Sequence, residues 1–235
     1  MTESAVDFRA LAPRELARYI QHTRIEVGLT RDDMIEHARQ SVEFGFNAAM
    51  VPGSWVPLVA GELAGTGVLV ASALDFPIVG VTTSAGKAFE AEQLVKAGAA
   101  QIDIGVQIGW LKSGMFDEFR EDIAGVVRAA GVPIKVMLEL PLLTPDEKEA
   151  AVQLSIEAGA AYLKNASSGQ IETANPESIR YLVERAPDGV YVKASGSIKH
   201  YDQAIDLLEA GAVLLGTSAG IAIIGDTSDA NTVSY

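Results

Sequence analysis

Short apolar runs alternate with longer amphipathic stretches along this chain, and this alternation constrains the fold more than any other feature. The runs are rich in Val, Ile and Leu, and the stretches between them have a helical period and mixed charge. Such a rhythm predicts βα units and a parallel sheet. The expected strands are Tyr19–Thr23, Asn47–Val51, Val68–Leu74, Gln101–Gly105, Ile134–Leu138, Ala161–Lys164, Val190–Lys193 and Val213–Gly216.

Helical patterns fill the gaps between these runs. The clearest are Thr30–Phe44, Lys87–Ala97, Phe116–Ala130, Asp146–Ala158 and Pro176–Arg185. Three helices end in a related phrase, KAGAAQID, EAGAAYLK and EAGAVLLG. A glycine just after a helix accepts the left-handed conformation that ends it. The recurrence indicates repeated αβ units within one fold.

Eight strands favour a closed (β/α)₈ barrel, and 235 residues are an ordinary length for one. A doubly wound sheet would more often carry a Gly-rich fingerprint after its first strand. The segment GTGVLV, Gly65–Val70, is too short for that motif and precedes a strand. We therefore expect a single barrel domain over residues 1–235, with a polar, mobile tail at Gly225–Tyr235.

Charge and cysteine content exclude several classes of function. The formal net charge is −13 and no basic stripe stands out, which argues against a nucleic-acid partner. A phosphorylated small molecule stays open, because a local site can be positive on an acidic protein. The chain has no cysteine, which excludes disulfides, thiolate nucleophiles and zinc–thiolate clusters.

The beginning of the chain, MTESAVDFRA, lacks the basic and apolar regions of a signal peptide. No run approaches the ~20 apolar residues that a membrane span needs. We expect a soluble, cytoplasmic protein with no membrane partner.

Three charged residues lie within or just after apolar runs: Asp103 in QIDIG, Lys164 in AYLKN and Lys193 in YVKAS. In an α/β barrel, polar groups at the carboxyl ends of strands face the active-site mouth. Each lysine alone could merely cap a strand or pair with a nearby carboxylate. Two lysines on successive strands, with an aspartate across the mouth, favour a functional site.

Such a trio suits Schiff-base chemistry. A neutral amine attacks a carbonyl, and the protonated imine then acts as an electron sink for breaking or forming a C–C bond. An ordinary lysine, with a pKa of about 10.4, is protonated at neutral pH. A second cation or burial lowers that pKa, and an aspartate can move protons.

The stretches Lys96–Gly169 and Tyr191–Gly220 carry a resemblance that covers nearly the whole chain. In order and spacing they resemble the deoxyribose-phosphate aldolases, class I aldolases built on an α/β barrel. The resemblance implies Lys164 as the Schiff-base lysine and Lys193 as the lysine that lowers its pKa. It implies Asp103 as the proton-transfer residue, and it implies no metal and no organic cofactor.

The chain departs from the family pattern near the implied site. The first strand reads IQHT where the family has I-D-H-T, so Gln21 replaces an acidic residue. Met50 stands where the family has a cysteine. The K-T-S-T-G segment appears as KNASSG, which puts Asn165 and Ala166 in place of hydroxyl residues.

The implied phosphate-binding loops are altered as well. The family's S/A-G-G-[IV]-R reads SGSIK, and its G-[TA]-S-S reads GTSA, which loses a hydroxyl at Ala219. Ser197 adds a Cβ where close backbone approach is wanted, and Lys199 lacks the guanidinium fork. The residues expected to bind substrate or phosphate are Gly196, Ser197, Lys199, Gly216 and Ser218.

The last residue, Tyr235, is a further candidate, because some family members end in a tyrosine that folds into the site. A tail without a role is the alternative. The family also suggests a homodimer.

The histidines, His22, His37 and His200, are scattered and predict no metal site. Lys135 and Glu139 share one strand, where they could pair in the mouth or hold barrel layers together.

Three functions remain open. The first is the family reaction, cleavage of 2-deoxyribose 5-phosphate to glyceraldehyde 3-phosphate and acetaldehyde. The second keeps the lysine chemistry but uses another, unphosphorylated donor or acceptor in a specialised biosynthetic pathway. The third is a barrel that only binds a sugar phosphate; the retained polar trio argues against it.

Overall fold

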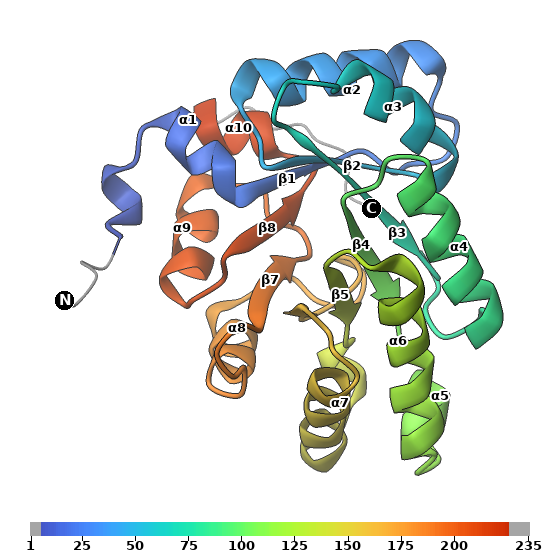
Figure 1. Ribbon diagram of the computed structural model, residues 1–235. Coiled ribbons are helices and arrows are strands. Elements are labelled where there is room, and N and C mark those ends of the chain that lie inside the picture. The colour runs from blue at the N-terminus through green and yellow to red at the C-terminus, as the bar shows by residue number, and fades with distance from the viewer. Residues whose placement is uncertain (1–5, 226–235) are drawn as a thin grey trace.

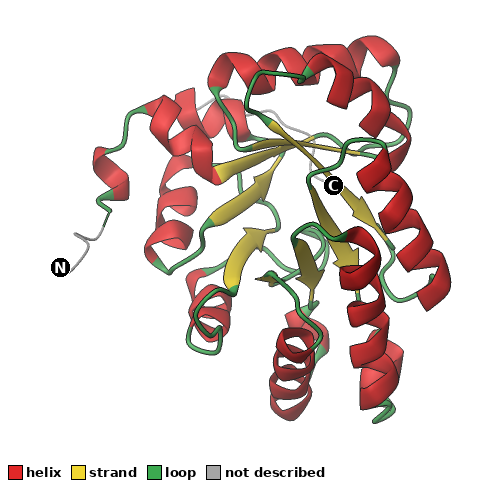
Figure 2. Ribbon diagram, in the orientation of Figure 1, coloured by secondary structure: helices red, strands yellow, loops and turns green. Residues whose placement is uncertain are grey.

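The computed structural model describes residues 6–225, and its eight strands close into a parallel barrel. Neighbours in the barrel follow sequence order, and β8 pairs with β1. In Figure 2 the yellow strands form the inner ring and the red helices cover its outside. The strands are β1 (Ile20–Thr23), β2 (Ala48–Val51), β3 (Leu69–Leu74), β4 (Gln101–Gly105), β5 (Ile134–Met137), β6 (Tyr162–Lys164), β7 (Tyr191–Ser195) and β8 (Leu214–Thr217).

The (β/α)₈ barrel and all eight expected strands are confirmed. The strand ends differ from the expected ones by at most two residues, the largest difference being the extension of β7 to Ser195. The helices and turns in Figure 1 are α1 (Pro13–Leu16), α2 (Arg31–Phe44), α3 (Val56–Glu62), α4 (Ser84–Lys96), α5 (Ile108–Lys112), α6 (Phe116–Ala130), α7 (Pro145–Glu157), α8 (Pro176–Val183), α9 (Tyr201–Glu209) and α10 (Gly220–Gly225), with 3-10 turns η1 (Phe8–Ala10), η2 (Ala17–Tyr19), η3 (Gly53–Trp55) and η4 (Leu140–Leu142).

The three recurring glycines end helices as expected. Gly98, Gly159 and Gly211 have φ of 113°, 90° and 105°, conformations that L side chains rarely adopt. Each lies between a helix and the strand that follows it, so the chain can turn sharply back into the barrel. The phrase therefore marks the same turn in three αβ units.

Alternation along the strands divides the side chains between two environments. In β4, Ile102 and Ile104 belong to the apolar layer between strands and helices, whereas Asp103 lies outside that cluster. A small separate apolar cluster contains Ala48, Met50 and Ala71 of the neighbouring strands β2 and β3. On the same side, β4 to β7 also carry the buried charged residues Asp103, Lys135, Lys164 and Lys193, which belong to the site described below.

No helix within residues 6–225 is long and apolar enough to cross a membrane. Residues 226–235, including the candidate Tyr235, lie outside the described part of the chain.

Candidate active site

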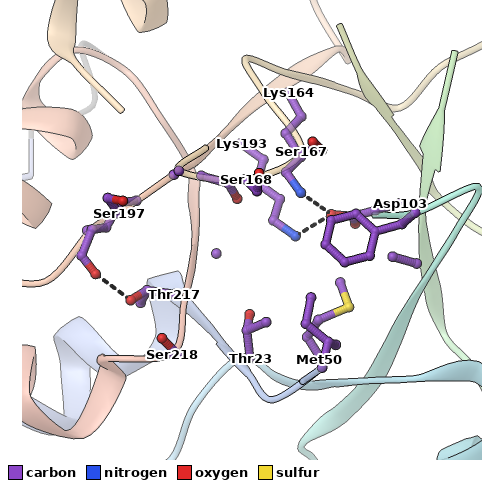
Figure 3. A pocket seen from close by; sticks show the side chains of 18 of the residues that line it. Thr23, Met50, Asp103, Lys164, Ser167, Ser168, Lys193, Ser197, Thr217 and Ser218 are labelled. Carbon is purple, nitrogen blue, oxygen red and sulfur yellow. Dashed lines mark hydrogen bonds and ion pairs between the residues drawn. The ribbon is translucent and has the colours of Figure 1, made fainter. Parts of the chain in front are cut away.

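A pocket opens at the carboxyl ends of the strands, where a barrel of this kind places its active site. All eight candidate residues within residues 6–225 line it: Asp103, Lys164, Lys193, Gly196, Ser197, Lys199, Gly216 and Ser218. In Figure 3 the two lysines point to Asp103, while Thr23 and Met50 lie across the pocket from them.

One carboxylate gathers three lysines at the base of this pocket. Asp103 Oδ2 lies 2.7 Å from Lys193 Nζ and 3.0 Å from Lys164 Nζ, and both amines donate hydrogen bonds to it. Lys135 Nζ lies 3.4 Å from Oδ1 of the same carboxylate. We call these four residues the lysine cluster. It comes from β4, β5, β6 and β7, whose registers place Asp103 beside Lys135 and Lys164 beside Lys193.

The three amines differ in access to the pocket. The Lys164 side chain is 7% exposed, Lys193 is 1% exposed and Lys135 is fully buried. Lys135 does not line the pocket; its Nζ lies 5.4 Å from the centre of the Tyr162 ring. Lys164 is therefore the amine that a substrate meets first.

Burial and mutual repulsion set the proton affinities of the lysine cluster. Burial lowers the pKa of Lys193 well below its usual value; Asp103 opposes this shift, and Lys164 and Lys135 add to it. Burial also lowers the pKa of Lys135 to about 8. Burial alone would raise the pKa of Asp103, but the three ammonium groups outweigh it and hold that pKa far below its usual range.

Gln21 of β1 completes the surroundings of Lys193. Its Oε1 accepts a 2.6 Å hydrogen bond from Lys193 Nζ, and its Nε2 donates to Gln101 Oε1, also at 2.6 Å. Gln21 is fully buried. The sequence placed it near the site, and the structure makes it a direct contact of a candidate catalytic lysine.

Gly216 leaves room for Lys193. A Cβ at this position of β8 would lie 3.0 Å from Lys193 Cε and would overlap the Ser195 hydroxyl. Gly216 does line the pocket, but its missing side chain also lets the lysine cross the barrel.

Tight backbone packing holds the loop after β7. A Cβ on Gly196, whose φ is 121°, would overlap the carbonyl of Glu172. Ser197 has a φ of 48°, a strained value for a residue with a Cβ. Its hydroxyl occupies the space that a Cβ on Gly169 would need, so these two loop residues are matched to one another.

Side chains already engage two backbone N–H groups of the implied phosphate loops. Lys199 N donates to Gln203 Oε1 at 3.0 Å, and Ala219 N donates to Thr217 Oγ1 at 2.9 Å. A phosphate would have to use other donors or displace these acceptors.

The idea that Lys135 and Glu139 pair in the mouth is wrong. Lys135 contacts Asp103, whereas Glu139, with a left-handed φ of 52°, accepts a 3.0 Å hydrogen bond from Ser167 N. The strand ends between the two residues and the backbone turns, which separates their side chains.

The histidines are not all scattered. The His22 and His37 rings lie 4.7 Å apart, and Phe46 stacks on His22. Burial, the first cause in both cases, lowers the pKa of His22 to about 4 and that of His37 to about 3. Within residues 6–225 no group of three or more His, Cys, Asp or Glu side chains could hold a metal ion.

A second buried ionic cluster was not predicted from the sequence. Lys87 of α4 forms an ion pair with Asp122 of α6, lies 3.6 Å from Asp75 Oδ2 and donates to the Gly105 carbonyl. The Lys87 side chain is fully buried. A signal existed, because Lys87 is in line with Ala91 and Leu94 on the buried stripe of its helix.

The chain is similar to curated enzymes over most of its length. It is 41% identical to the deoxyribose-phosphate aldolase of Methanothermobacter thermautotrophicus over 211 residues, 89% of this chain and 94% of the relative. It is 36% identical to that of Mannheimia succiniciproducens over 218 residues, 92% of this chain and 97% of the relative. No protein-family model matches the chain.

Solved structures of the same family superpose on this chain. A putative deoxyribose-phosphate aldolase from Coccidioides immitis superposes with a TM-score of 0.86 at 29% identity, covering 92% of this chain and 86% of the other. The tetrameric deoxyribose phosphate aldolase of Aeropyrum pernix superposes with a TM-score of 0.84 at 28% identity, covering 92% of each chain. With relatives this similar over nearly its whole length, the chain belongs to the deoxyribose-phosphate aldolase family and is an enzyme, an aldehyde-lyase.

Proposed function

We propose that this aldolase works through a Schiff base on Lys164. The observation that carries the proposal is the lysine cluster, in which a carboxylate shared by three buried amines lies at the base of the pocket. Of the three amines, Lys164 has the most exposed side chain. It is the nucleophile.

Each step assigns a task to a residue of the cluster. Neutral Lys164 Nζ attacks the aldehyde carbon of the open-chain sugar, and loss of water leaves a protonated imine. A base removes the proton of the C3 hydroxyl, and the C2–C3 bond breaks. Its electron pair moves into the imine to give an enamine, and a second aldehyde departs. Protonation at C2 and hydrolysis then release acetaldehyde and restore the amine.

Lys193 and Asp103 serve the proton movements in this scheme. Lys193 donates to the same Asp103 oxygen as Lys164, and it is the proposed second lysine of the mechanism. Asp103 Oδ2 bridges both amines and can pass protons between them and the substrate, directly or through water. Tyr235 is a further candidate for the proton step at C2.

The relatives suggest 2-deoxyribose 5-phosphate as the substrate. The residues proposed to hold its phosphate are Gly196, Ser197, Lys199, Gly216 and Ser218. A second candidate is an unphosphorylated donor or acceptor. The engaged N–H groups of Lys199 and Ala219, and the strained Ser197 that closes on Gly169, favour it.

A cleavage assay on the purified full chain separates these functions. Acetaldehyde release from 2-deoxyribose 5-phosphate, well above release from 2-deoxyribose, supports the family reaction. Comparable rates on both sugars support the unphosphorylated alternative. No release from either sugar, together with no borohydride-trapped adduct from any small aldehyde or ketone, contradicts the enzyme mechanism and supports a binding barrel. Sedimentation in the same buffer tests the proposed homodimer.

A further inference from the structure

The lysine cluster is short of negative charge. Among residues 6–225, Asp103 is the one carboxylate within 4.0 Å of the three amines, so complete protonation would leave two positive charges there without a counter-charge at that distance. Side-chain exposure is 7% or less throughout the cluster, so water screens these charges poorly.

Gln21 occupies the position from which a further charge could act. Its Oε1 lies 2.6 Å from Lys193 Nζ. On its other side, Gln21 Nε2 donates to Gln101 Oε1 at 2.6 Å and to Asn47 Oδ1 at 3.3 Å. Gln21 thus gives Lys193 a hydrogen-bond acceptor without giving it a counter-charge.

We propose that Gln21 is a positioning residue that sets the proton count of the lysine cluster, so that one of its three amines is neutral in the resting enzyme at neutral pH. The inference rests on the proposed function only for the purpose of the neutral amine, since a neutral amine is the species that attacks a carbonyl. The proton count itself is a property of the protein without substrate.

The other groups that face the cluster are consistent with this count. The Tyr162 ring lies under Lys135, and burial raises the pKa of its phenol above an already high ordinary value, so it adds no negative charge at neutral pH. Glu139 acts on Lys164 from the end of β5; burial raises the pKa of Glu139, while its hydrogen bonds with Ser167 and the charge of Lys164 oppose that shift. Burial also lowers the pKa of Lys193 and Lys135, in the direction that the proposal requires.

Lysine NMR tests the proposal without substrate. The chain has eight lysines, so selective ¹³C labelling gives a simple spectrum in which the ¹³Cε shift reports each protonation state. The native protein should show one cluster lysine in the neutral form at pH 7.5, assigned with Lys135→Met and Lys193→Met variants. A cluster with all three amines charged at that pH overturns the proposal.

The variant Gln21→Glu then places a carboxylate beside Lys193 on a side chain of the same length. Gln101 can turn its amide to donate to the new oxygen. We expect all three amines to be charged at pH 7.5, and the pH profile of borohydride-trapped adduct formation to move up by about one unit or more. An unchanged lysine spectrum and pH profile in a folded Gln21→Glu protein overturn the proposal.

Gln107→Glu is the matched control. Gln107 is another buried amide, and it donates to the Thr82 carbonyl, outside the cluster. The new charge there should leave the cluster spectrum unchanged, and an equal shift would mean that any buried glutamate produces the effect. If Gln21→Glu does not fold, a native spectrum with all three amines charged still overturns the proposal. A trapping experiment that fails at Lys164 would contradict the proposed function and leave this proton count standing.

Discussion

Two buried ionic clusters in this barrel have opposite charge balance. Between α4 and α6, one lysine, Lys87, meets two carboxylates, Asp122 and Asp75, and also donates to a backbone carbonyl. Inside the barrel, as far as the described part of the chain shows, three lysines meet one carboxylate, Asp103.

This difference in charge balance distinguishes a cluster that stabilises the fold from a cluster suited to chemistry. Lys87 has several acceptors, so burying its charge is compensated by contacts that join α4 to α6. The amines of the lysine cluster repel one another and share one carboxylate, which favours the loss of a proton from one of them. Of the two clusters, only the lysine cluster reaches the pocket at the carboxyl ends of the strands, through Asp103, Lys164 and Lys193. A buried lysine is a sign of reactivity when its neighbours leave it short of negative charge.

The largest expected effect is the loss of turnover in Lys164→Ala. Removing the nucleophile should lower the rate of C–C bond cleavage by about 10⁴-fold or more, equivalent to about 5 kcal/mol of activation free energy. Initial rates with the best substrate of the cleavage assay measure it. Lys96→Ala, at an exposed surface ion pair, is the control and should retain the native rate. A Lys164→Ala enzyme within tenfold of the native rate would remove Lys164 from the mechanism.

Lys87→Met should cost stability instead. It leaves two buried carboxylates without their cation, and breaking such a pair costs about 3–5 kcal/mol. Urea unfolding at pH 7 measures the loss. If the variant folds, we expect its trapping of acetaldehyde to match the native protein. A variant that keeps native stability would show that this cluster does not hold α4 on α6.

His22 and His37 form a third buried group of titratable side chains, and burial keeps both rings neutral at pH 7. The folded-state pKa values of His22 and His37 are about 4 and about 3, below the unfolded value of about 6.5. Below pH 6.5 the unfolded chain therefore binds protons that the folded chain does not. Stability is complete above that pH and is lost as the pH falls toward 4 and then 3.

Between pH 6.5 and pH 5, His37 alone should account for about 2 kcal/mol of this loss. Urea unfolding at the two pH values, compared with His37→Phe, measures it. We expect the variant to lose less stability on acidification. An identical pH dependence in both proteins would mean that His37 is protonated in the fold.

The smallest effect on stability should come from Lys135→Met. It removes an amine from the cluster with excess positive charge, fills a similar volume and relieves repulsion of Lys164. We expect the free energy of unfolding to change by about 1 kcal/mol or less, in contrast to Lys87→Met. A loss of about 3 kcal/mol or more would show that both clusters are structural.

The sequence was sufficient for the barrel because its signals are local. Runs of Val, Ile and Leu predict strands buried on both faces, and Gly98, Gly159 and Gly211 end helices wherever the phrase recurs. Asp103, Lys164 and Lys193 were predictable as neighbours, since the carboxyl ends of parallel strands meet at one edge.

The rest depended on register and on side-chain paths, which no local pattern encodes. Lys135 lies beside Asp103 only because β4 and β5 pair in that register. The packing of α2 on β1 brings His37 against His22. That Gly216 makes room for Lys193 can be seen only once the path of the lysine across the barrel is known.

The most direct test of the account is to locate the trapped amine. The native chain is incubated with acetaldehyde and borohydride, and peptide mass spectrometry then assigns the reduced two-carbon adduct among the eight lysines. We predict one adduct, on Lys164, that disappears in Lys164→Ala and persists in Lys87→Met. An adduct on Lys193 or Lys135 in the native chain, or labelling spread over the surface lysines, would contradict the assignment of Lys164 as the Schiff-base nucleophile.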